Sequence, residues 1–506
     1  MHDWSVVGRN GARWHRPSLI AVAGCLLASP LMAAPVGAGV GTSGGRWERD
    51  AVRRYESSFT GSRGEAIGLA VHRSAAIPAF ARKYGLPCSA CHTAWPELNA
   101  FGQVFRDNGY QLMNDRDSPI WQNPGYWPAT VRITPQWHLE TTTHQPTDAV
   151  PGDSTSGLID RKITQHGFDL SGMDLWFAGT LYKNISFVVL PSSDNTASFH
   201  FEAAFVRFDN LFNNRWVNFK AGKFELDNLI SEKRFLFLSN NGGLYQSYHF
   251  LPPGDINDFG LGDNQIGAEL SGHSVDSHTR YGVAVLSSTD GEVGLPGNRA
   301  YDGMATFSQA FDAGRLGVQR IGAFAYVGQR PTLFQSTGGV PIPGTGLGNK
   351  SFYRVGLAGD FFFGKLEFLP FFMHASDSKY LATGTPSDSP LPAGAQDATW
   401  NSGFLETHYY ISPQFVLTQR DEFVRMSDQG LSSTPSTLGN IDAYSFGYRY
   451  YPIMFSRAGL CWHGEVSVTK TIGGVPLSGD GAGVPPFSPA TAVWSTSVLM
   501  ALDFDF

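Results

Sequence analysis

The chain after residue 128 alternates between apolar residues and small or polar ones. In segment 443–450, one face is aromatic and carries Tyr444, Phe446, Tyr448 and Tyr450. The opposite face carries Ala443, Ser445, Gly447 and Arg449. A period of two with one apolar face is typical of transmembrane β-strands. A soluble β-sandwich also alternates, but its apolar face is mostly aliphatic. The pattern therefore predicts an all-β fold in which residues 128–506 form a porin-like outer-membrane barrel.

The connections between the apolar segments predict the number of strands. Counting back from the C-terminus, long and short connections alternate. The long ones lie near 470–490, 426–440, 374–399, 328–350, 287–301, 224–263, 191–197 and 141–164. The short ones lie near 452–455, 411–413, 362–364, 311–316, 273–278, 211–214 and 182–184. These connections join 16 strands. With both ends of the barrel in the periplasm, every long loop is extracellular and every short turn periplasmic.

The composition agrees with a barrel and excludes several other classes. Of 506 residues, 42% are hydrophobic and 13% aromatic, but only 16% are charged, below the roughly 25% of soluble domains. Four cysteines are too few for a disulfide scaffold, and the net charge of -7 predicts no nucleic-acid partner. Past residue 40, no uncharged apolar run approaches the roughly 20 residues of a spanning helix.

The N-terminus resembles an export signal. Arginines precede residue 18, and residues 19–40 carry no charge, which is the order of a secretory signal peptide. Residues 1–33 are the predicted signal, cleaved after Ala33, and residues 34–76 are a linker. A retained membrane anchor and a lipoprotein box ending at Cys25 are the alternatives. Together with the predicted barrel, the export signal predicts that the protein lies in the bacterial outer membrane.

One short motif carries specific chemistry. Residues 88–92 read Cys-Ser-Ala-Cys-His, the C-x-x-C-H attachment signature of c-type haem. Cys88 and Cys91 can add to the two vinyl groups of one porphyrin, and the His92 imidazole can then reach the iron. A zinc site would need two more ligands at suitable spacing, and a thioredoxin-like motif would need a βαβ context. The sequence therefore predicts one covalent haem c, with His92 as its proximal ligand.

Residues 77–127 form the predicted haem segment. A short amphipathic helix starts at Pro96 and stops at Gly109, and its apolar residues, together with 77–80, cover the macrocycle. Met113 is the nearest downstream candidate for the sixth ligand and would raise the potential. The competing candidates are His72, His138, His166, His200 and His249. A segment of some 50 residues buries a haem poorly alone, so it needs the barrel as a partner surface.

Two further features concern the barrel. The long connection 224–263 contains the apolar run 235–238 and several acidic residues. We expect it to fold into the lumen, narrow the pore and cover the haem or line a cation path; a surface flap or an oligomer contact is the alternative. Cys461 lies on a predicted strand and is interpreted as a wall residue.

The haem segment resembles that of the fused monohaem cytochrome–porins, outer-membrane proteins of iron-oxidising bacteria and their relatives. The resemblance covers about 35 residues: the string 78–85, the motif 88–92, then Leu98, Phe101-Gly102, Phe105 and Gly109-Tyr110. The barrel matches that family in architecture only, and the long linker before the motif is a departure from it.

The resemblance implies an electron-transfer protein that carries electrons from extracellular Fe(II) to a periplasmic cytochrome or copper protein. In enzymatic terms this is Fe(II):cytochrome c oxidoreductase activity. It also implies that Cys88 and Cys91 hold the haem and that His92 ligates the iron. A conduit for another extracellular donor or acceptor and a porin-like channel with an accessory haem segment are the alternatives. A periplasmic haem enzyme would need a paired acid and base, which the sequence does not offer.

Overall fold

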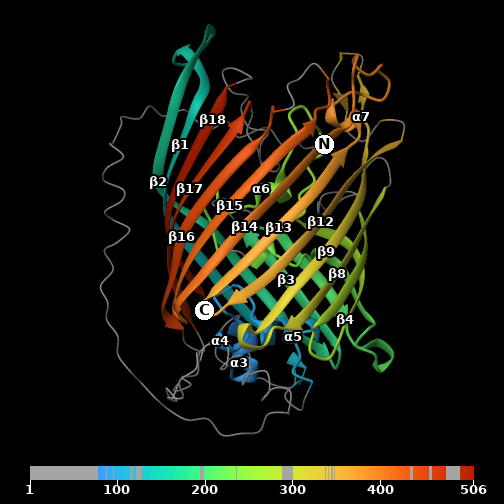
Figure 1. The fold of residues 1–506 in the computed structure, drawn as a ribbon, viewed down its shortest axis with the longest axis vertical. Helices are drawn as coiled ribbons and strands as arrows, with labels where there is room; N and C mark the ends of the chain where they lie inside the picture. Colours follow the sequence, from blue (N-terminus) through green and yellow to red (C-terminus); the bar gives the residue numbers. More distant parts are fainter. Residues whose placement is uncertain are drawn as a thin grey trace.

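The computed structural model describes residues 78–86, 88–94, 96–113, 117, 119–120, 128–193, 199–234, 236–287, 300–336, 338–339, 341–342, 346, 348–432, 437–454, 458–473 and 491–505. The predicted signal peptide 1–33 and linker 34–76 lie outside these residues, as do the tips of the predicted connections near 191–197, 287–301 and 470–490. Within the described part, sixteen antiparallel strands close into one barrel (Figure 1).

The first nine strands of the barrel are β1 (Ala129–Val150), β2 (Asp153–Tyr182), β3 (Ile185–Ser193), β4 (His200–Phe208), β5 (Asn218–Glu225), β6 (Asn264–His273), β7 (Thr279–Ser287), β8 (Tyr301–Asp312) and β9 (Val318–Pro331). The other seven are β12 (Asn349–Phe363), β13 (Leu366–Asp377), β14 (Ala398–Ser412), β15 (Phe415–Asp428), β16 (Ile441–Met454), β17 (Gly459–Ile472) and β18 (Ala492–Asp505). The loops hold the small pair β10 (Phe334–Gln335) and β11 (Pro341–Ile342), α7 (Lys379–Ala382), and the 3-10 turns η3 (Leu211–Asn213) and η5 (Gly314–Leu316).

The barrel closes where β1 pairs with β18, in a register that runs from Arg132 opposite Asp505 to Thr142 opposite Ser495. The predicted strand number is confirmed, because each short turn and, apart from 141–164, each long loop falls between the expected strands. The start of β1, the end of β18 and all the short turns lie at one end of the barrel. That end is the periplasmic one in barrels of this kind.

Burial on β16 confirms which face of that strand meets the lipid. Tyr444 and Phe446 on β16 are 53% and 55% exposed, whereas Ser445 and Arg449 between and beyond them are buried. Because the barrel is closed, each of its strands pairs with a neighbour on both sides, which is what a β-structure requires in a bilayer. The protein lies in the bacterial outer membrane.

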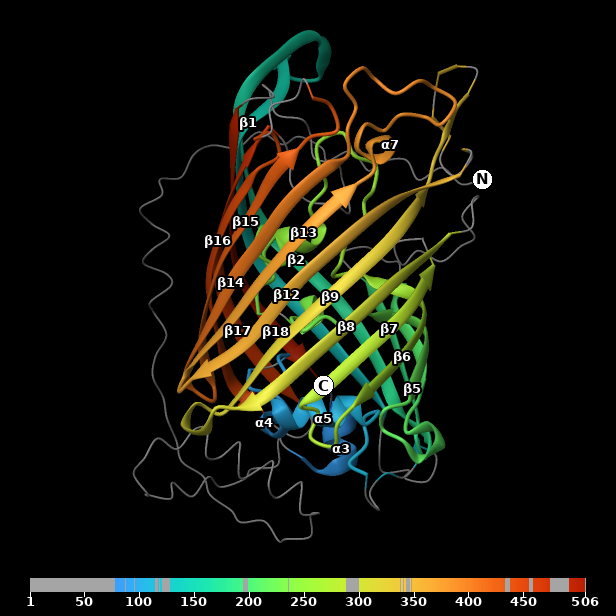
Figure 2. The same cartoon turned by 45° about the vertical axis from the view of Figure 1, so that its right-hand side comes forward.

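The predicted loop 141–164 is wrong. β1 and β2 continue as a paired hairpin up to Val150 and Asp153, and both views show it projecting beyond the other strands (Figures 1 and 2). The tip is polar and rich in threonine, so it lacks the apolar alternation by which a membrane strand is recognised. The β-branched residues nevertheless favour an extended backbone, and the cross-strand ladder continues into water.

Among the described residues, three helices precede the barrel: α3 (Pro78–Tyr84), α4 (Cys88–Cys91) and α5 (Ala100–Asp107). They lie together at the end of the barrel that holds the short turns and the C-terminal strand end (Figures 1 and 2). The predicted helix start at Pro96 is wrong, because Asn99 caps the helix and α5 begins at Ala100. Gly109, with φ +69°, follows the helix as its predicted stop. In the described part of the chain, none of the helices has the length and apolar character to cross a bilayer.

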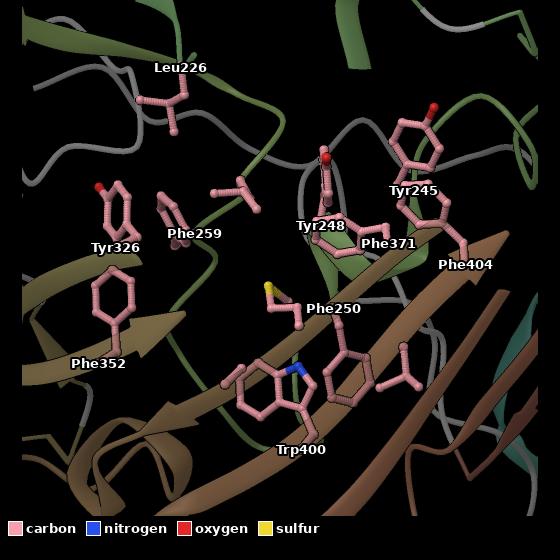
Figure 3. Packing of buried hydrophobic residues seen from close by; sticks show 14 of the residues in the cluster. Leu226, Tyr245, Tyr248, Phe250, Phe259, Tyr326, Phe352, Phe371, Trp400 and Phe404 are labelled. Atoms are coloured by element: carbon pink, nitrogen blue, oxygen red, sulfur yellow. The ribbon is translucent and has the colours of Figure 1, made fainter. Parts of the chain in front are cut away.

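The described residues between 226 and 263 lie inside the barrel, as expected, and contain η4 (Glu232–Arg234) and α6 (Gln246–His249). Their aromatic side chains pack on inward-facing wall residues (Figure 3). Tyr245 stacks on Phe404 of β14 at 4.3 Å between ring centroids, and Phe259 lies 4.2 Å from Tyr326 of β9. We call residues 226–263 the lumen loop.

The lumen loop also bonds to the opposite part of the wall. The Leu238 amide donates to Glu465 of β17 at 2.6 Å, and the Asn241 amide donates to Ser497 of β18 at 3.3 Å. One loop is thus attached to both sides of the lumen, so it obstructs the pore. A surface flap is excluded.

Candidate functional site

The C-x-x-C-H motif occupies α4 and the residue after it, and α5 packs tightly against it. The Asn99 side chain caps α5 by accepting from the Gly102 amide at 2.9 Å, and its Nδ2 donates to the carbonyls of Ser89 and Ala90. One asparagine therefore fixes the angle between the two helices. Gly102 permits the close approach, because a Cβ atom there would lie 2.0 Å from the Cys91 carbonyl oxygen.

We expect Gly102→Ala to push α5 away from α4. Overpacking of this kind costs about 1–3 kcal/mol, and the displaced motif should take up less covalent haem. Haem content per folded barrel, from pyridine haemochrome absorbance, measures the effect. The control is Gly303→Ala, because a Cβ on Gly303 of β8 would meet nothing within 4 Å. Equal haem content in the two variants would contradict the role assigned to Gly102.

His92 is held as an iron ligand would have to be. Its Nδ1 lies 2.9 Å from the Glu97 carbonyl and 3.1 Å from the Pro96 carbonyl, so Nδ1 carries the proton and Nε2 keeps its lone pair. Metal-binding histidines are commonly fixed in this way by a backbone carbonyl. Burial lowers the pKa of the His92 imidazole to about 4, so the ring is neutral at ordinary pH.

Cys91 is a half-buried thiol rather than an activated one. Burial raises its pKa to about 12, whereas the reactive cysteine of a redox C-x-x-C has a lowered pKa. The side chain of Cys88, the first residue of α4, lies outside the described part of the structure.

A cavity of about 440 Å³ separates the helices from the barrel wall. Cys91 and His92 line it, together with Phe80, Leu98 and Phe105 from the same segment. The wall contributes apolar side chains from β2 to β5 and from β16 and β17: Trp176, Val188, Leu190, Phe205, Phe224, Tyr451, Ile453, Leu460 and Cys461. Six basic side chains also line it: Arg106, Arg132, Arg207, Lys220, Lys233 and Arg234. The size lies in the ordinary range for ligand pockets.

The C-terminal end of α5 is anchored to the wall by charge. Arg207 of β4 donates to the carbonyls of Arg106 and Asp107 at 2.8 and 3.0 Å. A cation at this end also complements the helix dipole. Arg280 of β7 pairs with Asp107 at 3.0 Å and with Asp227 of the lumen loop at 2.7 Å. Because these groups are buried, breaking one pair leaves an uncompensated charge and costs about 3–5 kcal/mol.

Helix α3 docks on the opposite side of the segment. Lys83 donates to Thr180 of β2 at 2.5 Å, and Phe80 stacks on Tyr110 at 5.1 Å between centroids. Phe80 and Phe105 meet edge to face at 5.4 Å. The segment thus completes its hydrophobic core with the barrel wall, as its small size led us to expect.

The structure brings only part of the predicted ligand set together. Cys91 and His92 share the cavity. Met113 does not line it, and its Sδ lies 4.0 Å from Asn210 Nδ2 in the turn after β4. Among the alternatives, His72 lies outside the described residues, and the described histidines His138, His166, His200 and His249 do not line the cavity either.

The lumen loop covers the cavity on the side of the pore. Its residues Lys233 and Arg234 belong to the cavity lining. Lys233 pairs with Glu202 of β4 at 2.7 Å, and Arg234 pairs with Glu225 at 3.0 Å. Sequence reasoning missed these residues, because nothing local marks a side chain that meets its partner only in the closed barrel, and it also missed Asn99. The one usable signal was Asn99 at the start of an apolar helical period.

No protein-family model and no curated protein matches the chain. Solved structures with a similar fold include an anion-selective porin from Comamonas acidovorans, with a TM-score of 0.46 and 11% identity, over 74% of this chain and 99% of that one. OprB from Pseudomonas putida has a TM-score of 0.44 and 9% identity, over 75% and 94%. OmpT of Vibrio cholerae, in its trimer form, has a TM-score of 0.42 and 11% identity, over 74% and 100%. The chain is a porin-like outer-membrane barrel, and this placement rests on its own closed sheet and apolar exterior.

Proposed function

We propose that this barrel holds one covalent haem c in its periplasmic mouth and carries electrons across the outer membrane. The observation that supports the proposal most is the joint position of Cys91 and His92 on a largely apolar cavity, with the His92 Nδ1 already committed to two carbonyls. The residues present therefore fit the group that the C-x-x-C-H motif implies.

The roles of the residues follow from their positions. Cys88 and Cys91 would hold the haem by thioether bonds, and His92 Nε2 would ligate its iron. Phe80, Leu98 and Phe105 would exclude water from the macrocycle. When bound, the haem supplies a one-electron centre whose potential depends on burial and on axial ligation. Met113 remains a prediction for the sixth ligand.

The position of the cavity suits a conduit better than an open pore. Insoluble or charged donors do not usefully cross the outer membrane, whereas an electron can be passed between centres. The cavity lies at the periplasmic end, where a soluble cytochrome or copper protein can approach, and the lumen loop obstructs the rest of the pore. Extracellular Fe(II) is the donor that we propose, in accord with the resemblance of the haem segment.

A porin-like channel with an accessory haem segment is the second candidate. The sixteen-stranded barrel and its likeness in fold to porins favour it. In that case electron transfer is secondary, and small solutes pass between the lumen loop and the wall.

Proteoliposomes that contain a trapped soluble cytochrome c separate the two functions. With Fe(II) added outside, one electron leaves each Fe(II) to give Fe(III), and one trapped ferric haem becomes ferrous. We expect its absorbance to change faster than in liposomes that contain the double variant Cys88→Ala, Cys91→Ala. Equal rates would overturn the conduit. A solute conductance that is unaffected by the double substitution, together with equal rates, would establish the channel.

A further inference from the structure

A second cluster of ligand-type side chains lies beside the haem segment and has no role in the proposed function. It joins Glu97, between α4 and α5, to Glu367 of β13 and His408 of β14. One potential ligand atom from each residue lies within 4.8 Å of the other two. The Glu367 and His408 side chains are each 2% exposed, and that of Glu97 is 15% exposed. The connection between α4 and α5 thus meets two adjacent strands from a distant part of the sequence at a nearly dry point.

The hydrogen bonds of His408 leave one of its nitrogens in an unusual position. Its Nε2 lies 2.8 Å from Glu406 Oε1, so the ring donates there. Its Nδ1 faces two carboxylate oxygens, at 2.9 Å from Glu367 and 3.2 Å from Glu97. A neutral imidazole has only one N–H, so its Nδ1 lone pair would point at two anions. A proton or a metal cation must therefore lie between His408 and these carboxylates.

The surroundings favour a metal cation over a proton. A carboxylate that accepts from the far nitrogen of a histidine, as Glu406 does, is the usual outer partner of a metal-binding histidine. Arg420 in turn lies 3.4 Å from Glu406. The Tyr410 hydroxyl reaches Glu367 at 2.5 Å and Glu97 at 2.9 Å, and so holds the two carboxylates in place.

Asp360 of β12 adds a further carboxyl group beside this cluster. Its carboxyl group lies against that of Glu367, close enough to share a proton with it, and its Oδ1 has no hydrogen bond to any other described residue. Buried carboxylates in contact need a shared proton or a cation between them. Asp360 thus adds a further oxygen at the edge of the same cluster.

We propose that Glu97, Glu367 and His408 bind one divalent transition-metal cation of the Mn(II) and Fe(II) class. Carboxylate and imidazole donors together suit these ions. Two ligand atoms that bind one ion at about 2.1 Å and at right angles to each other lie about 3 Å apart. The distances from His408 Nδ1 to the carboxylate oxygens of Glu367 and Glu97 are already close to this value. The ligand atoms need only small movements to bind an ion.

The site goes beyond the proposed function, but it adjoins the haem segment. The Glu97 carbonyl accepts from His92 at 2.9 Å, while the Glu97 side chain is a ligand of the proposed cation. The cation therefore ties the segment that carries the motif to the wall at β13 and β14.

Electron paramagnetic resonance of Mn(II) tests the site without depending on haem. The full chain in detergent is first treated with a chelator and then titrated with Mn(II). One Mn(II) per protein should bind and lose its free-ion signal. Fe(II) should compete for the site, and Ca²⁺ should not. We expect Glu367→Gln and His408→Gln to weaken binding at least about tenfold, by comparison with the losses known for metal-site partners. Each variant is first shown to be folded by its heat-modifiable gel mobility.

Glu232→Gln is the matched control, because Glu232 and His249 form a buried carboxylate–imidazole pair at 2.5 Å in the lumen loop. It should bind Mn(II) as the parent does. The double variant Cys88→Ala, Cys91→Ala should also bind Mn(II), so loss of haem and loss of the cation are distinguishable. Absence of binding by the folded parent, or equal binding by all variants, would overturn the proposal and leave a hydrogen-bonded network around a protonated His408.

Discussion

The double variant Cys88→Ala, Cys91→Ala is expected to contain no covalent haem. Thioether bonds can form only from these two thiols in the motif, so denaturing gels stained for haem peroxidase activity should show no band at the mass of the protein. The barrel should still fold, because its sixteen-stranded sheet closes through β1 and β18 without the helices.

Cys461→Ala is the control for this experiment. Cys461 of β17 lines the same cavity but lies outside the motif, so its removal should leave the haem stain unchanged. A stained band in the double variant, or its loss in Cys461→Ala, would show that the haem is attached in another way.

Removal of residues 230–250 is expected to open the pore. These residues include the 3-10 turn η4, helix α6 and the contacts with β17 and β18. Single-channel conductance in planar bilayers should therefore rise. The haem cavity should also become accessible, because Lys233 and Arg234 line it, and a bulky reductant should reduce the haem faster. Unchanged conductance and an unchanged reduction rate would show that the loop neither narrows the lumen nor covers the cavity.

A milder variant and a control accompany the deletion. Tyr248→Ala removes a side chain that is 3% exposed and lies 5.0 Å from the Phe371 ring. Truncation of a buried aromatic side chain lowers stability by about 3–5 kcal/mol. The loop should therefore pack less firmly against the wall but stay in the lumen. Removing residues 147–159, the tip of the β1–β2 hairpin outside the lumen, should leave conductance unchanged.

The charge within the lumen loop supports its fixed position. Although burial lowers the pKa of His249, the neighbouring Glu232 carboxylate raises it to about 9. His249 is therefore charged in the folded protein at neutral pH, and its pair with Glu232 is complete below that value. The ionic stabilisation of the loop is lost as the pH rises through about 9, because the folded-state pKa lies above the ordinary one.

Local patterns were sufficient for much of the fold. The period of two in segments such as 443–450 fixed which residues face lipid, since a bilayer accepts only apolar side chains there. The alternation of long and short connections gave the strand number. The same reasoning failed at 141–164, because a strand in water needs no apolar face. It also failed at Pro96, because the capping side chain of Asn99 determines where α5 begins.

The sequence by itself determined the barrel and the five-residue motif, since periodicity and C-x-x-C-H spacing are local properties of the chain. Only the tertiary structure decided what those residues meet. It placed Cys91 and His92 on a cavity shared with the wall, and the lumen loop across the pore. It also brought Glu97 to Glu367 and His408, which are more than 250 positions away along the chain. Closing a barrel turns distant strands into neighbours, and no local pattern records which inward side chains will then face each other.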